Sequence, residues 1–190
     1  PVSYIHIHAL RHDGVFYPVE DKALKLEFIG DSITSGEGTF GARQEEDWIP
    51  MFFSSLRDYA YLTAKELDAE YRVLSQSGWG VCNTWDNNPN GALPKYYRQI
   101  CGLMQSDMNA DLGGNENFDF ASWQPDVIVV NLGTNDASAF DQPEWVDDET
   151  GKRHKMHKNP DGSYKEEDIA YFKKAVKDFL HTLRECNPGA

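Results

Sequence analysis

Three residues of this chain, each just after an apolar run, have the groups that acyl transfer requires: Ser32, Gly78 and Asn135. A hydroxyl can attack the carbonyl carbon of an ester, and hydrogen-bond donors must then hold the oxyanion that forms. Ser32 provides a hydroxyl, while its own N–H, the Gly78 N–H and the Asn135 amide provide donors. Glycine also lets the backbone approach a substrate closely. These residue types suggest a serine hydrolase.

A parallel sheet would bring the three residues together. Apolar runs at Leu24–Ile29, Tyr71–Leu74 and Val127–Val130 predict strands, and the unbroken β-branched run of the third is typical of a strand covered on both faces. Apolar stripes predict helices from about Phe53 to Leu67 and from about Glu166 to Arg184. This alternation predicts an α/β fold, a three-layer α/β/α sandwich, with all strand ends at one edge.

The loop after the first strand also allows another chemistry. Gly36, Gly38 and Gly41 match the spacing G-x-G-x-x-G, which cradles a phosphate in dinucleotide-binding folds. Such a fold needs its first glycine at the strand end, but the strand here ends earlier, at Gly30, and Glu37 would repel a pyrophosphate. We therefore expect these glycines to shape the loop and not to bind a phosphate.

The three polar segments, in this order, closely resemble the SGNH (GDSL-type) hydrolases. The serine, glycine and asparagine of that family's name match Ser32, Gly78 and Asn135, and the resemblance covers roughly residues 24–190. It implies the SGNH hydrolase fold, in incomplete form, and a serine esterase that needs no metal and no organic cofactor.

A narrower resemblance is to family-two carbohydrate esterases, which place a β-sandwich (jelly-roll) domain before the hydrolase. It rests on an upstream hairpin, the turn Ser77-Gly78-Trp79-Gly80 and the segment Phe118–Trp123. It implies removal of O-acetyl groups from oligo- or polysaccharide such as xylan or mannan, and a secreted protein, although no signal is visible and a cytoplasmic location stays open. Trp79 and Trp85 are candidates to stack a sugar ring, with core packing the alternative for each.

Residues 1–22 are expected to be a remnant of that β-sandwich and its linker, and residues 23–190 the hydrolase domain without its C-terminal part. Alternating residues around the turn Asp13-Gly14 predict a β-hairpin. His6 and His8 share one strand face there, which we interpret as polar surface and not as a metal pair.

The histidine base of the family has no convincing counterpart in this chain. The family's D-x-x-H pattern occurs as Asp178 to His181, but inside the amphipathic last helix, so we expect an ordinary, partly exposed histidine. His154 and His157 would serve only if the polar excursion from Ala137 to Tyr164 folded over Ser32. We expect the base outside this chain. The alternatives are a non-catalytic carbohydrate-binding protein with a relict cleft, or an SGNH lipase or thioesterase.

Two acids adjoin the candidate catalytic residues. Asp31 and Asp136 are expected to hold the nucleophile loop by accepting backbone N–H bonds, and not to bind a metal together with Glu37. In the polar excursion, Asp161-Gly162 suggests the turn of a surface hairpin.

Composition narrows the class of partner. The net charge of -13 over 190 residues argues against a nucleic-acid backbone or an anionic membrane surface. No apolar run approaches the roughly 20 residues of a membrane-spanning helix. Three widely spaced cysteines give neither a disulfide framework nor a zinc site.

Overall fold

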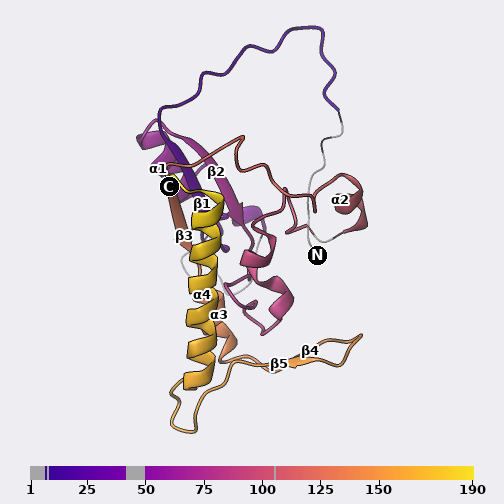
Figure 1. Ribbon diagram of the computed structural model, residues 1–190, viewed down its shortest axis with the longest axis vertical. Helices are drawn as coiled ribbons and strands as arrows, with labels where there is room; N and C mark the ends of the chain where they lie inside the picture. The colour runs from indigo at the N-terminus through magenta and orange to yellow at the C-terminus, as the bar shows by residue number, and fades with distance from the viewer. Residues whose placement is uncertain (1–6, 8, 42–49, 105) are drawn as a thin grey trace.

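A three-stranded parallel sheet runs through the centre of the structure, a computed structural model that describes residues 7, 9–41, 50–104 and 106–190 (Figure 1). The strand order is β2-β1-β3, with β1 (Lys25–Gly30) between β2 (Glu70–Ser75) and β3 (Val127–Asn131). Gly30 pairs with Ser75 on one side and with Asn131 on the other, so the strands end level with one another. The three predicted strands and their common edge are confirmed.

Helices cover both faces of the sheet because alternate residues of β1 are apolar on opposite sides. Leu26 and Phe28 pack under α1 (Tyr59–Glu66), while Ile29 belongs to the core cluster beneath α4 (Glu166–Cys186). Figure 1 shows α4 running along the sheet as the longest element of the chain. The three-layer α/β/α arrangement is therefore confirmed, as is the amphipathic final helix.

The first helix begins later than its apolar stripe predicts. Asp58 is its N-cap, in an extended conformation, and its Oδ1 accepts the Tyr61 N–H at 2.8 Å. The predicted start at Phe53 is wrong because this cap fixes the first turn at Tyr59, and Leu56 before it is exposed.

The predicted N-terminal hairpin is not formed by the residues of it that are described: residues 9–22 form neither strand nor helix. Val15, Phe16 and Tyr17, which the alternation placed on a strand, are 78%, 73% and 85% exposed. An isolated hairpin buries too little surface to be stable, and no strand of the described residues pairs with these positions. His6 and His8 lie outside the described residues.

Shorter elements fill the connections. They are η1 (Pro50–Phe52), η2 (Pro89–Gly91), η3 (Leu93–Tyr96), α2 (Asp107–Asp111), α3 (Thr134–Ala139), β4 (Trp145–Val146) and β5 (Arg153–His154). β4 and β5 form a hairpin that projects from the end of the molecule where α3 lies (Figure 1). The turn expected at Asp161-Gly162 is also present, closed by one antiparallel bridge between Lys158 and Tyr164.

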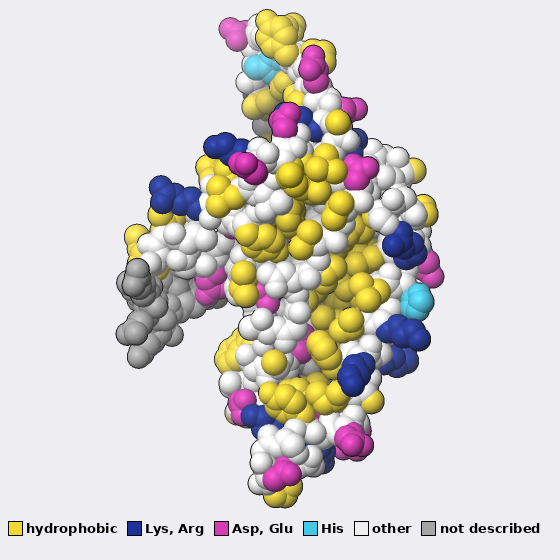
Figure 2. Space-filling view, turned by 90° about the vertical axis from the view of Figure 1, so that its left-hand side faces the viewer, with side chains coloured by type: hydrophobic (Ala, Val, Ile, Leu, Met, Phe, Trp, Pro, Cys, Tyr) yellow, Lys and Arg dark blue, Asp and Glu magenta, His cyan; other side chains and the backbone are white. Residues whose placement is uncertain are grey.

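The outer side of β3 remains apolar on the surface. Val127 and Val130 of β3 and Leu180 of α4 are 46%, 38% and 53% exposed, and Figure 2 shows a band of hydrophobic side chains on this face, bordered by Lys and Arg. A hollow of about 590 Å³ lies between β3 and α4, and none of the predicted site residues lines it. Among the described helices, none is long and apolar enough to cross a bilayer.

A buried ion pair ties β1 to β2. Glu27 is fully buried; its Oε1 lies 2.7 Å from Arg72 Nη2, and its Oε2 accepts the Tyr97 hydroxyl at 2.7 Å. The Arg72 guanidinium also lies 4.0 Å from the ring centroid of Phe118. A charge buried to this degree is tolerated only while it is paired.

We therefore expect Arg72→Met to lower the free energy of unfolding by about 3–5 kcal/mol, because it leaves the Glu27 carboxylate buried without its counterion. Urea denaturation measures the change. Lys22→Met is the control, since Lys22 pairs with Asp68 on the surface and its loss should cost about 0.5 kcal/mol or less. Equal stability of the two variants would contradict a structural role for the pair.

Candidate active site

One side chain links the three strand ends. Asn135 Nδ2 donates to Asp31 Oδ2 at 3.2 Å and to the Trp79 carbonyl at 2.8 Å. Asp31 directly precedes Ser32, and Trp79 directly follows Gly78. The segments that carry the three predicted catalytic residues therefore lie together at the carboxyl edge of the sheet.

The nucleophile loop turns sharply after β1. Asp31 Oδ1 accepts the Ile33 N–H at 3.0 Å, and the Asp31 carbonyl accepts the Ser35 N–H at 3.0 Å. Gly30 permits this turn, because a Cβ there would lie 1.9 Å from Thr34 Oγ1. Ser32 is half-buried, and within the described residues no hydrogen bond engages its hydroxyl. As far as the described residues extend, the loop thus presents Ser32 with a hydroxyl that makes no hydrogen bond.

Asp31 accepts a backbone N–H of the loop that carries Ser32, that of Ile33, as the sequence predicted. Its carboxylate is also buried, and this burial raises its pKa, opposed by the Ile33 N–H and reinforced by the nearby charge of Asp136. The Asn135 amide is its other donor. Asp31 is therefore a carboxylate whose position depends on donors from two strand ends.

The Gly78 turn requires glycine. Its φ of +79° lies in the left-handed region, and a Cβ would lie 3.0 Å from Trp85 Cδ1. The Trp85 N–H closes the turn on the Gly78 carbonyl at 2.9 Å. In the described part of the chain, neither the Gly78 N–H nor the Ser32 N–H donates a hydrogen bond, so both remain available to an oxyanion.

The two candidate sugar-stacking tryptophans differ in their surroundings. Trp85 is 47% exposed and lies against Gly78. Trp79 is half-buried, its ring centroid is 5.2 Å from that of Tyr96, and it packs on the core beneath α4. The geometry favours Trp85 as a surface beside the strand ends and gives Trp79 a packing role.

Asp136 occupies a different place from the one expected. It lies in the first turn of α3, is 1% exposed, and accepts the N–H groups of Val81 and Cys82, each at 2.8 Å. It therefore holds the loop after β2 and not the nucleophile loop. The sequence could not distinguish the two loops, because both follow strands that end at the same edge.

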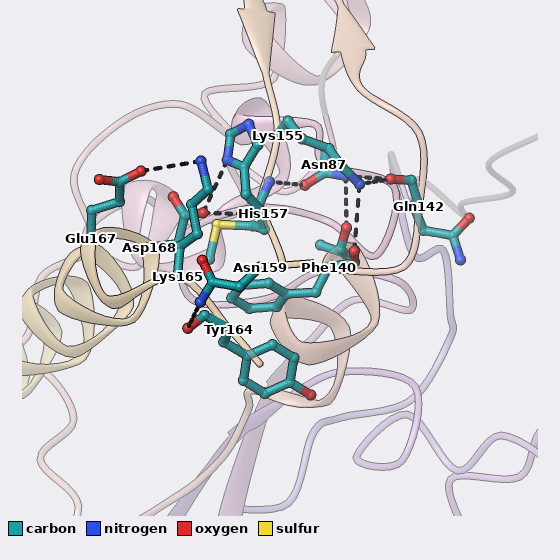
Figure 3. A network of polar contacts seen from close by, with 12 residues as sticks. Asn87, Phe140, Gln142, Lys155, His157, Asn159, Tyr164, Lys165, Glu167 and Asp168 are labelled. Atoms are coloured by element: carbon teal, nitrogen blue, oxygen red, sulfur yellow. Dashed lines mark hydrogen bonds and ion pairs between the residues drawn. The ribbon is translucent and has the colours of Figure 1, made fainter. Parts of the chain in front are cut away.

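None of the described histidines is hydrogen-bonded to Ser32. His157 Nδ1 lies 3.0 Å from Asp168 Oδ2 at the start of α4, as Figure 3 shows. His154 packs edge-on against an α4 tyrosine, and its burial lowers its pKa. His181 is exposed on α4, as predicted. No hydrogen bond joins any of the described histidines to Ser32.

The sequence reasoning missed Asn87, which anchors the polar excursion. Asn87 is fully buried at φ +70°, a backbone region that asparagine enters more readily than most residues. Its Nδ2 donates to the carbonyls of Ala139 and Pro143 at 2.8 and 2.9 Å, and its Oδ1 accepts the Met156 N–H at 2.9 Å. The loop after β2 and the excursion after β3 are thereby fastened together.

Across the residues that the structure describes, no group of three His, Cys, Asp or Glu side chains is arranged to hold a metal ion. The carboxylates of Asp31 and Asp136 instead accept hydrogen bonds from protein donors. Within the described residues, the site therefore offers the Ser32 hydroxyl, which makes no hydrogen bond, beside the N–H groups of Ser32 and Gly78, which donate none.

Comparison with known proteins gives one matching family and several similar solved structures. Residues 28–190 match the GDSL-like lipase/acylhydrolase family. The fold is similar to that of an acetyl xylan esterase from the rumen bacterium Butyrivibrio proteoclasticus, with a TM-score of 0.88 and 52% identity over 95% of this chain and 48% of that one. A family two carbohydrate esterase from Cellvibrio japonicus has a TM-score of 0.64 and 25% identity over 91% of this chain and 42% of that one.

A curated relative is the acetylxylan esterase / glucomannan deacetylase of Cellvibrio japonicus (strain Ueda107). It is 32% identical over 115 residues, which are 60% of this chain and 30% of the relative. The chain thus spans about half of the similar solved structures and less of this relative.

Proposed function

The chain belongs to the GDSL-like lipase/acylhydrolase family, and from that membership we propose that it carries the nucleophile and oxyanion donors of a serine esterase. The substrate is an O-acetylated oligo- or polysaccharide such as xylan or mannan. The observation that carries the proposal is the Asn135 amide, which joins the segment of Ser32 to the segment of Gly78.

In the proposed reaction, Ser32 Oγ attacks the acetyl carbonyl carbon and forms a new C–O bond while its proton passes to a base. The N–H groups of Ser32 and Gly78 receive the oxyanion. When the intermediate collapses, the ester bond to the sugar breaks, and the sugar leaves as an alcohol that takes up a proton. Water then hydrolyses the acetyl-Ser32 ester and releases acetate, which restores the serine.

Asn135 supplies the third donor. Its amide nitrogen donates two hydrogen bonds, at 2.8 Å to the Trp79 carbonyl and at 3.2 Å to Asp31 Oδ2. The longer bond, to Asp31, is the one that the oxyanion replaces. Among the residues that the structure describes, no histidine is hydrogen-bonded to Ser32, so the general base is assigned to none of them.

The substrate class follows from the relatives and from the surface beside the site. The similar proteins are named as acetyl xylan esterases and as a glucomannan deacetylase. The half-exposed indole of Trp85 next to Gly78 offers a flat apolar surface of the kind on which sugar rings stack. A polysaccharide such as xylan or mannan is too large to enter a cell, so we propose a secreted enzyme. We also propose that residues 23–190 belong to the hydrolase domain, in line with the family match over residues 28–190.

Acetate release tests the function. The full-length protein should release acetate from acetylated xylan or glucomannan, and should prefer p-nitrophenyl acetate to p-nitrophenyl palmitate. Binding to the polysaccharide without acetate release would favour a non-catalytic carbohydrate-binding protein. A preference for the palmitate ester would favour a lipase.

A further inference from the structure

The carboxylate of Asp136 receives more donors than a supporting acid in a turn needs. Besides the N–H groups of Val81 and Cys82, its Oδ1 lies 3.0 Å from Cys82 Sγ, which donates to it. The side chain is 1% exposed and Cys82 is 3% exposed. A buried carboxylate with three protein donors is fixed in place, and it fixes the groups that donate to it.

Gly80 makes room for this carboxylate. A Cβ on Gly80 would lie 2.3 Å from Asp136 Oδ2 and 2.5 Å from the Asn83 carbonyl. The absence of a side chain at this position therefore lets the carboxylate lie directly against the backbone of the loop. Gly80 is two residues from Gly78, so the contact fixes the same turn that presents the Gly78 N–H.

Two consecutive residues of α3, Asn135 and Asp136, form hydrogen bonds to different backbone groups of this turn. Asn135 donates to the Trp79 carbonyl, and Asp136 accepts from the amides of Val81 and Cys82. The first residues of α3 thus hold this loop through the Trp79 carbonyl and through the amides of Val81 and Cys82. Its position relative to Ser32 depends on both residues.

We propose that Asp136 is a positioning residue that sets the direction of the Gly78 N–H toward the oxyanion, with the Cys82 thiol as its third donor. The proposal rests on the proposed esterase function. Asp136 does not touch the substrate; it acts by holding the loop. Cys82 acts through Asp136, by completing the donors around the carboxylate.

The thiol is suited to this role because it stays protonated. Burial raises the pKa of Cys82 far above its ordinary value, and the charge of Asp136 raises it further. A thiol in this state donates its hydrogen and is a poor nucleophile. Cys82 is therefore assigned a structural hydrogen bond and no reaction of its own.

The test is the kinetics of Asp136→Asn in the full-length protein on p-nitrophenyl acetate. Either orientation of the new amide places its NH₂ group opposite a backbone N–H, so the loop must shift. We expect kcat to fall about 10- to 100-fold with KM changed about twofold or less, because a displaced donor is felt in the transition state. The inhibition constant of methylboronic acid, which forms a tetrahedral adduct with a nucleophilic serine, should rise by the factor that kcat/KM falls.

Asp126→Asn is the matched control. Asp126 also accepts a backbone N–H, that of Lys25 at 2.7 Å, but it lies at the opposite end of β3. Its substitution should leave kcat and methylboronic acid inhibition unchanged. The dissociation constant of xylohexaose, which has no acetyl group, should be the same for both variants and the wild type.

Cys82 variants keep the test decisive if Asp136→Asn does not fold. Cys82→Ala keeps both backbone bonds and should lower kcat about three- to tenfold, while Cys82→Ser keeps a donor and should restore kcat to within about twofold. Wild-type kcat in the Asp136→Asn variant, or in Cys82→Ala if Asp136→Asn does not fold, would overturn the positioning role. A wild type that is inactive, or no more active than Ser32→Ala, would instead overturn the proposed function.

Discussion

Replacing Ser32 by alanine is expected to lower kcat for acetate release by about 10⁴-fold or more, because the substitution removes the atom that forms the acyl-enzyme bond. The Ser32 hydroxyl is free of hydrogen bonds within the described residues, so the loop does not depend on it for its shape. Stability should therefore stay near that of the wild type, which urea denaturation can confirm.

Ser35→Ala is the matched control on the same loop. The Ser35 hydroxyl is already engaged, with the Asp31 carbonyl at 3.1 Å and with Ser75 Oγ at 2.8 Å. Its loss removes loop hydrogen bonds but no reacting atom, and kcat should stay within about tenfold of the wild type. Equal loss in both variants would mean that the loop, and not the Ser32 hydroxyl, is what the reaction requires.

Asn135→Ala is expected to lower kcat by about 10²–10³-fold, the usual cost of one oxyanion donor. The substitution also removes the bonds to Asp31 and to the Trp79 carbonyl, so the strand ends lose their shared contact. Steady-state kinetics on p-nitrophenyl acetate measure the loss. KM should change less than kcat, since the donor acts mainly on the oxyanion.

Asn109→Ala separates this effect from the general cost of removing a buried asparagine. Asn109 is 4% exposed and donates to the Cys101 carbonyl at 3.0 Å in the connection before β3. It should lower stability and leave kcat unchanged. An unchanged kcat in Asn135→Ala would remove Asn135 from the oxyanion site.

The parts of the fold that periodicity controls were predictable from the sequence. The β-branched run of Val127–Val130 and the apolar stripe of the last helix are strong local signals, and both elements form where they were expected. That the segments of Ser32, Gly78 and Asn135 lie together was predictable because each follows a strand, and parallel strands end at one edge.

Contacts between loops were not predictable in the same way. Asn87 reaches carbonyls more than 50 positions along the chain, and Asp136 selects the loop after β2 over the nucleophile loop. Nothing in the spacing of these residues encodes such partners. The predicted strand at Val15–Tyr17 was wrong for another reason. The local alternation was present, but these side chains are exposed and do not pack on a core.

Covalent labelling tests most directly whether Ser32 is the nucleophile. The full-length protein would be treated with a fluorophosphonate, which reacts covalently with activated serines, and then digested for peptide mass spectrometry. We expect a single adduct at Ser32, lost in Ser32→Ala together with acetate release. An adduct at Ser35 or Ser77, or acetate release that persists when Ser32 is replaced, would contradict it.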